Sequence, residues 1–200
     1  LIGVLMVPLM WGVAVFNRFV TLRNRYQNAY AQIDVQLKRR YDLIPNLVTA
    51  TRAYLAHERQ TLEAVIAARQ RASDASEVAL HRPRDGQALV ALEAAEAALA
   101  RPLSRLMALV EQYPELRADD TVHRLTEELG TTENRIGFAR QAFNDQVMSY
   151  NTAVESFPAS LVASWCGFGT ANVLRATASA QERQPVAVAV ARLFRRQHED

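Results

Sequence analysis

The sequence predicts an all-α protein: a long antiparallel helical bundle of three to four helices, with coiled-coil-like packing and an N-terminal transmembrane helix. Of the 200 residues, 50% are hydrophobic, while glycine and proline number only 7 each, which favours helix over sheet or disorder. Apolar residues recur at spacings of three and four, the period of a buried helix face. Residues 1–16 carry no charged side chain.

Residues 1–16 are predicted to be a retained membrane anchor. At 1.5 Å per residue they span about 24 Å, so residues upstream of Leu1 are needed to cross roughly 30 Å of hydrocarbon. A buried core helix and a cleaved signal peptide are the alternatives, but no small-x-small cleavage site precedes the following helical sequence. Arg18, Arg23 and Arg25 follow the apolar run, and no acidic residue occurs before Ile33. This asymmetry favours a cytoplasmic position for the bulk domain, with a periplasmic position as the alternative.

The soluble bundle is predicted to span residues 17–180, with a poorly ordered tail at 181–200. Its first helical stretch runs to about residue 71, where Pro45 either kinks one helix or lies in the first turn of a second helix capped by Asp42. Arg40 and Thr61 lie on the buried stripe, which is therefore not purely apolar. The apolar members of the stripe are Phe19, Tyr26, Tyr30, Ile33, Leu37, Ile44, Leu47 and Tyr54.

Residues 73–87 contain Asp, Ser, Pro and Gly, and are predicted to connect to a second helix at 87–112. Pro102 bends that helix, and Tyr113-Pro114 ends it. A third helix of about 50 Å is predicted at 121–155, begun by capping oxygens among Asp119, Asp120 and Thr121. Pro158 then stops or bends the chain before a last helix at 159–180. The seam of the third helix consists of Val122, Leu125, Leu129, Thr132, Ile136, Ala139, Phe143, Gln146, Tyr150, Ala153 and Phe157.

Two blocks contain polar residues of fixed identity that a helical pattern alone does not require. The first is the run at residues 33–48, and the second includes Glu133, Asn134, Arg140, Asn144 and Asn151. Together they resemble the signature of the LemA family, membrane-anchored helical proteins of bacteria, over roughly residues 1–168. The resemblance implies a single-pass protein of the inner membrane and leaves its molecular activity open. Tyr41 stands where the family usually has His, and Phe143 where it usually has Tyr.

The sequence gives little support for an enzyme, a cofactor or a metal. His57-Glu58 matches half of a zincin helix, but Thr61 stands where the second His must be. Neither a Gly-rich phosphate loop nor a Gly-x-Ser-x-Gly elbow occurs. The single cysteine, Cys166, is interpreted as a packing residue. A net charge of only +2, with acidic residues among the arginines, gives no nucleic-acid footprint.

Two interpretations of the polar blocks remain open. In the first, residues including Arg39, Arg40, Glu63 and Arg69 form ion pairs between helices and set the register of the bundle. In the second, a surface including Asp34, Lys38 and His57 binds a partner. The candidate residues for either role are Asp34, Lys38, Arg39, Arg40, Asp42, Asn46, His57, Glu58, Glu133, Asn134 and Arg140.

The predicted function is that of a non-catalytic scaffold or adaptor. Its expected partners are the lipid bilayer and another membrane or membrane-associated protein, with no nucleic acid. A small-ligand sensor with a pocket between helices and an enzyme without recognisable motifs are the alternatives.

Overall fold

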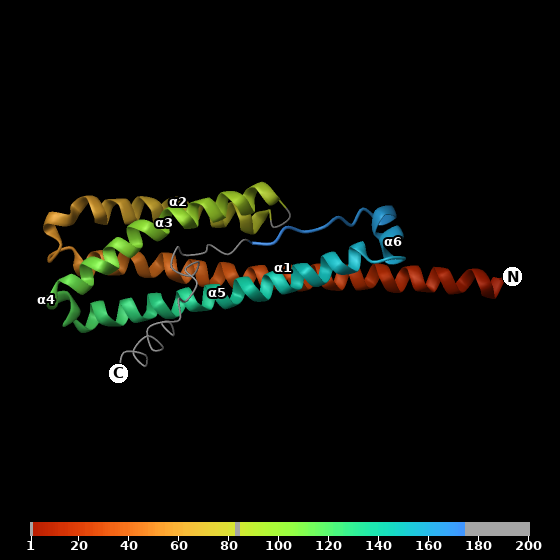
Figure 1. The fold of residues 1–200 in the computed structure, drawn as a ribbon, viewed down its shortest axis with the longest axis horizontal. Helices are drawn as coiled ribbons and strands as arrows, with labels where there is room; N and C mark the ends of the chain where they lie inside the picture. Colours follow the sequence, from red (N-terminus) through yellow and green to blue (C-terminus); the bar gives the residue numbers. More distant parts are fainter. Residues whose placement is uncertain (1, 83–84, 175–200) are drawn as a thin grey trace, which may run out of the picture.

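The computed structural model describes residues 2–82 and 85–174, with side chains from Met6 onward. The elements in chain order are α1 (Ile2–Thr51), the 3₁₀ turn η1 (Ala56–Glu58), α2 (Arg59–His81), α3 (Gly86–Gln112), α4 (Pro114–Arg117), α5 (Asp120–Glu155) and α6 (Ala159–Cys166). They form an elongated bundle in which α1 lies along α5 and α2 lies along α3 (Figure 1). No strand occurs in the described residues, and the all-α helical bundle is confirmed.

The first half of the bundle differs from the prediction in where the chain reverses. α1 passes through Pro45 without ending, so the interpretation as one continuous helix is correct. The helix then ends at Thr51, and the chain turns back through residues 52–58, where a continuous helix was predicted. The buried Leu55 fills the inside of this turn, while the predicted stripe member Tyr54 is exposed.

The predicted connection at residues 73–87 is also wrong. Residues up to His81 belong to α2, because Ala72, Ser76 and Ala79 form a buried face of small side chains against the bundle. The connection is therefore confined to the residues between His81 and Gly86. Asp85 caps α3 by accepting hydrogen bonds from the backbone N–H groups of Gln87 and Ala88.

The prediction for α5 is correct in position and in most of its register. Asp119 accepts hydrogen bonds from the N–H groups of Thr121 and Val122 and so caps the helix. The predicted seam is buried as far as Phe143, except that Ala139 is half-buried. Near the end, the predicted Tyr150 and Ala153 are buried, Val147 and Val154 are buried beside them, and Gln146 is half-buried. Phe157 lies beyond the helix and is 82% exposed. An α-helix drifts relative to a strict heptad, which moves the buried face in this way.

Aromatic side chains fill the interface between α1 and α5. The Phe143 ring lies edge-on to Tyr30, with centroids 5.7 Å apart, and to Tyr26 at 6.3 Å. The rings of Tyr26 and Tyr150 are 5.2 Å apart. Edge-to-face packing is a favoured arrangement of aromatic pairs, so these rings set how α1 and α5 face each other.

The last predicted helix is much shorter than 159–180. α6 ends at Cys166, where Gly167 adopts a left-handed conformation with φ of 72°. The chain then runs in an extended conformation beside α5 (Figure 1). Asn151 exchanges hydrogen bonds with the backbone of Ala171, and Asn144 does the same with Leu174. Residues 175–180 and the predicted tail at 181–200 lie outside the described residues.

The predicted transmembrane span at residues 1–16 is not supported by the described side chains, which begin at Met6. Within the described part of the chain, no helix is long and apolar enough to cross a membrane. α1 then continues into charged sequence at Arg18, so the predicted boundary between residues 16 and 17 lies inside one helix.

Candidate functional site

A buried ion-pair network lies in the middle of the bundle. Arg40 of α1 is 6% exposed. Its guanidinium contacts the carboxylate of Glu96 on α3, and its Nη1 atom donates to Glu133 Oε2 on α5 at 2.8 Å. The Tyr41 hydroxyl lies 2.6 Å from Glu96 Oε1 and 3.2 Å from the carbonyl oxygen of Ala72 on α2. The network therefore joins α1, α2, α3 and α5.

The electrostatics of the network favour the ionised pair. Burial lowers the pKa of Arg40, but the nearby carboxylates of Glu96 and Glu133 raise it by more. The pKa of Tyr41 is raised, first by burial and then by the Glu96 charge. Arg40 thus stays charged and Tyr41 stays neutral, which suits a fixed structural contact rather than proton transfer.

Asp34 is a second buried charged residue on α1, after Arg40. Its carboxylate accepts a hydrogen bond from Ser76 Oγ on α2 at 3.2 Å and pairs with Lys38 Nζ at 2.8 Å. The hydrogen bond that Lys38 donates to Asp34, together with the negative charge of Asp34, raises the pKa of Lys38. Arg69 of α2 also donates to the carbonyl oxygen of Tyr41 at 2.9 Å. Contacts between α1 and α2 therefore involve both motif residues and backbone.

The exposed candidates on α1 form a shallow hollow of about 460 Å³. Their charges already have partners: Lys38 pairs with Asp34, Arg39 lies 3.8 Å from Glu128, and Asp42 lies 3.8 Å from Arg69. The hollow is lined by Val35, Lys38, Arg39, Asp42, Leu43 and Asn46. This surface is solvent-facing, but its ionic groups are largely satisfied within the chain.

The remaining candidates are spread over other parts of the bundle. His57 is exposed in η1, and Glu58 lies 3.8 Å from Arg105 of α3. Asn134 is exposed on α5, and Arg140 is partly exposed. Within the predicted set, Asp34 and Arg40 are buried and contact other helices, whereas the exposed members are divided between the α1 hollow and other parts of the bundle.

Sequence reasoning missed two features. Glu96, the central carboxylate, lies in an alanine-rich helix outside both motif blocks, so no local pattern marks it. The second feature is a groove of about 690 Å³ where α1 ends and α2 begins. Its lining is Val48, Arg52, Leu55, Ala56, Arg59, Leu62, Glu63, Ile66 and Ala67. We call this the reversal groove; it exists only because the chain turns back at residues 52–58.

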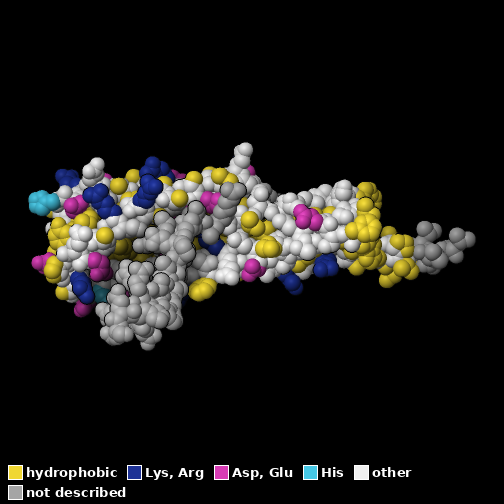
Figure 2. All heavy atoms as spheres, in the orientation of Figure 1, with side chains coloured by type: hydrophobic (Ala, Val, Ile, Leu, Met, Phe, Trp, Pro, Cys, Tyr) yellow, Lys and Arg dark blue, Asp and Glu magenta, His cyan; other side chains and the backbone are white. Residues whose placement is uncertain are grey.

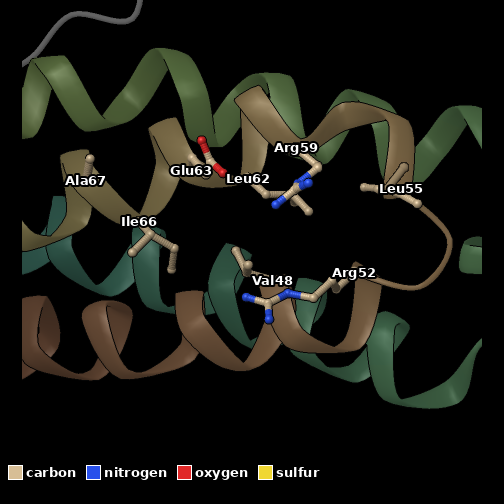
Figure 3. Close-up of a pocket in the computed structure, with 9 residues that line it drawn as sticks. Val48, Arg52, Leu55, Arg59, Leu62, Glu63, Ile66 and Ala67 are labelled. Carbon is tan, nitrogen blue, oxygen red and sulfur yellow. The ribbon is translucent and has the colours of Figure 1, made fainter.

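The reversal groove combines buried apolar side chains with two arginines whose side chains have no ionic partner in the described part of the chain. Val48, Leu55 and Leu62 are buried beneath it. Arg52 and Arg59 extend into it from the end of α1 and the start of α2 (Figure 3). Within the described residues, the side chain of neither arginine makes a hydrogen bond or ion pair.

A metal centre does not emerge from the geometry. Among residues 2–82 and 85–174, no group of three or more His, Cys, Asp or Glu side chains is placed to hold an ion. Cys166 is an exposed free thiol.

These features define an all-α bundle in which the buried Arg40 of one helix pairs with carboxylates of two others. Residues 29–189 match the LemA family, and the chain belongs to that family. It is 30% identical to magnetosome protein MamQ of Magnetospirillum gryphiswaldense over 168 residues, which cover 76% of this chain and 62% of the relative. Magnetosome proteins MamQ 1 and MamQ 2 of Paramagnetospirillum magneticum are each 28% identical over 172 residues, covering 78% of this chain and 63% of the relative. The chain thus spans less than two thirds of the length of these relatives.

Proposed function

We propose that the protein is a non-catalytic scaffold, attached to the bacterial inner membrane through the start of α1, that binds another protein in the reversal groove. One observation carries the proposal: the two ends of the elongated bundle differ in chemistry. Hydrophobic side chains gather at the end where α1 begins (Figure 2). The opposite end presents the unpaired arginines of the groove.

The apolar end suits a lipid environment. Val7 and Met10 are each 69% exposed, although they are large hydrophobic side chains. Residues 1–16 are uncharged in sequence, which supports a single-pass anchor. Arg18 and Arg25 follow, exposed and without a partner in the described chain. Such residues gain about 1 kcal/mol each near anionic lipid headgroups, and their position favours a cytoplasmic bundle.

The reversal groove suits an acidic protein segment with apolar side chains. Arg52 and Arg59 offer two positive charges above a hydrophobic floor, and the nearby Glu63 reduces the net charge without cancelling it. Unpaired charges at a rim steer a complementary partner and fix its register. The α1 hollow around Arg39 is a weaker candidate, because its charges are already paired within the chain.

The relatives are compatible with such a role. They are magnetosome proteins of two bacteria, and a helical scaffold that links a membrane to another protein fits a place in an organelle. The reversal groove is less suited to enclosing a small ligand, because it opens to solvent beside the exposed Ile66.

Peptide binding tests the groove. The probe is a fluorescent peptide of alternating Asp and Leu, compared with Lys/Leu and Asp/Ser peptides of equal length. We expect the protein to bind only the Asp/Leu peptide and to bind it more weakly in high salt. The double variant Arg52→Glu with Arg59→Glu should lose binding.

Arg71→Glu is the matched control, because Arg71 is an exposed arginine on α2 outside the groove lining. It should bind the peptide as the unaltered protein does. Equal loss in both variants would mean that net charge alone attracts the peptide. Unchanged binding after the double substitution would exclude the groove as the partner site.

A further inference from the structure

α6 presents large apolar side chains to solvent, although it is a short helix at the edge of the bundle. Trp165 is 90% exposed and Leu161 is 63% exposed. These residues are four positions apart and so share one face of the helix. Phe157, just before α6, is 82% exposed. Contiguous exposed hydrophobic residues mark an interaction surface more often than isolated ones do.

The opposite face of α6 is fixed to the bundle. Ala163 is buried, and the chain after α6 returns Phe168 to α1. The Phe168 ring lies 5.5 Å from the Phe16 ring and 5.2 Å from the Phe19 ring, measured between centroids. The Arg23 guanidinium lies 5.5 Å from the same ring. α6 is thereby packed against α1, and its exposed face has a defined direction.

α6 lies beside the apolar part of α1. A cleft of about 360 Å³ is formed by both helices, and apolar side chains make up nearly all of its surface. Its lining is Pro8, Leu9, Gly12, Val13, Phe16, Val162, Trp165 and Cys166. Figure 1 shows α6 near the N-terminal end of the bundle, with the first turns of α1 extending beyond it. Whatever surrounds Leu9 and Phe16 therefore also surrounds Trp165.

The charge distribution favours lipid as the occupant of this surface. No charged residue occurs between Glu155 and Arg175, so α6 and the returning segment are neutral throughout. Arg18 follows the cleft along α1, where it can reach phospholipid headgroups. Tryptophan prefers the boundary between headgroups and acyl chains, because its ring is apolar and its N–H needs a polar partner.

We propose that α6 is a second membrane-contacting element, which lies in the boundary layer of the phospholipid bilayer with Trp165 and Leu161 turned into it. The cleft between α1 and α6 would then be filled by acyl chains. This inference rests on the proposed attachment of α1 to the membrane. It goes beyond that attachment because it makes the membrane contact a two-helix surface, which fixes the orientation of the bundle as well as its location.

Tryptophan fluorescence tests the proposal, because Trp11 and Trp165 are the only tryptophans. Full-length Trp11→Phe protein leaves Trp165 as the reporter, and full-length Trp165→Phe leaves Trp11 on α1 as the matched control. Each is reconstituted into vesicles of phosphatidylcholine and phosphatidylglycerol after its helicity is checked by circular dichroism. We expect spin-labelled phosphatidylcholine to quench Trp165, more strongly when the label is near the headgroup. Aqueous iodide should quench Trp165 only weakly.

The control separates the two proposals. Lipid quenching of Trp11 with iodide quenching of Trp165 would overturn the role of α6 and leave the α1 anchor intact. Absence of lipid quenching at both tryptophans would overturn both. Protection of Trp165 from iodide without lipid quenching would mean that protein, such as a second copy of the chain, covers α6, and would also overturn the proposal.

A second measurement avoids any change to the tryptophans. Cys166 is the only cysteine, is exposed, and lines the same cleft. A polarity-sensitive thiol dye at Cys166 of the unaltered chain should shift its emission to shorter wavelength when vesicles are present. An unchanged emission would contradict contact between α6 and lipid.

Discussion

The Tyr41 hydroxyl lies 2.6 Å from Oε1 of Glu96, and this contact links the α1–α5 pair of helices to the α2–α3 pair. The same carboxylate contacts the buried guanidinium of Arg40, which also reaches Glu133. One glutamate on α3 thus receives two adjacent side chains of α1. We expect this network to limit how far the two helix pairs can slide along each other.

Arg40→Met should destabilise the protein by about 3–5 kcal/mol, because it leaves the buried carboxylate of Glu96 without a compensating charge. The Glu96 side chain is only 9% exposed. Urea unfolding followed by circular dichroism measures the loss. Adding Glu96→Gln should recover part of it, since the neutral amide costs less to bury.

Arg39→Ala is the control for Arg40. The Arg39 side chain is 51% exposed and lies 3.8 Å from Glu128. The free energy of unfolding of the Arg39→Ala protein should differ from that of the unaltered protein by less than about 0.5 kcal/mol, as at ordinary surface sites. If Arg40→Met costs no more than Arg39→Ala, the network does not lock the bundle.

Alkaline pH should weaken the fold partly through Tyr30. Its hydroxyl is buried without a hydrogen-bond partner among the described residues, and burial, followed by the Asp34 charge, raises its pKa above the ordinary 10.0. Above pH 10 the unfolded chain loses the Tyr30 proton while the folded chain retains it. The free energy of unfolding therefore falls as pH rises through this window.

Tyr30→Phe should remove this part of the alkaline loss and leave neutral-pH stability equal or higher, because it deletes an unsatisfied buried hydroxyl. Urea unfolding at pH 7 and above pH 10 gives both values. Tyr54→Phe is the control, since Tyr54 is 46% exposed. Destabilisation by Tyr30→Phe at pH 7 would indicate that the hydroxyl has a partner in solution.

Local signals explain which parts of the fold were predictable from sequence. α5 has a capping Asp119 and a long three-four pattern, and both its bounds and most of its seam are correct. The reversal at residues 52–58 has neither Gly nor Pro, and residues such as Arg52 and Ala53 favour helix. Burial of Leu55 in the bundle stabilises the turn. This burial depends on contacts with residues distant in the sequence, so the neighbouring residues alone do not predict it.

The ion-pair network was predictable from the sequence only in part. Arg40 stood out as a charged residue on a buried stripe, and Glu133 belonged to a recognisable block. Glu96 is 56 residues from Arg40 in sequence, and nothing near it in the chain marks it as a partner. The reversal groove could not be predicted, because Arg52 and Arg59 approach each other only after the chain turns.

Phe143→Ala should cost about 3–5 kcal/mol, because it removes a fully buried ring from the α1–α5 interface. Phe143 is 2% exposed and packs against Tyr26 and Tyr30. Phe138→Ala, on the same helix but 72% exposed, is the control and should change stability little. A loss below 1 kcal/mol for Phe143→Ala would contradict the observed register of α5 in solution.

Asn151→Ala should loosen the extended segment at Ala171 while leaving the helical bundle intact. Asn151 accepts a hydrogen bond from the Ala171 N–H at 2.8 Å and donates to its carbonyl oxygen at 2.9 Å, so a single amide satisfies both backbone groups of that residue. Removal of this amide should raise the hydrogen-exchange rate at Ala171, because its N–H then has only water as a partner. Leu174 should keep its slower exchange, since Asn144 holds it independently.

The exposed Asn134 of α5 provides the control, and Asn134→Ala should alter neither rate. If exchange at Ala171 is already fast in the unaltered protein, the asparagine contacts do not hold the segment in solution.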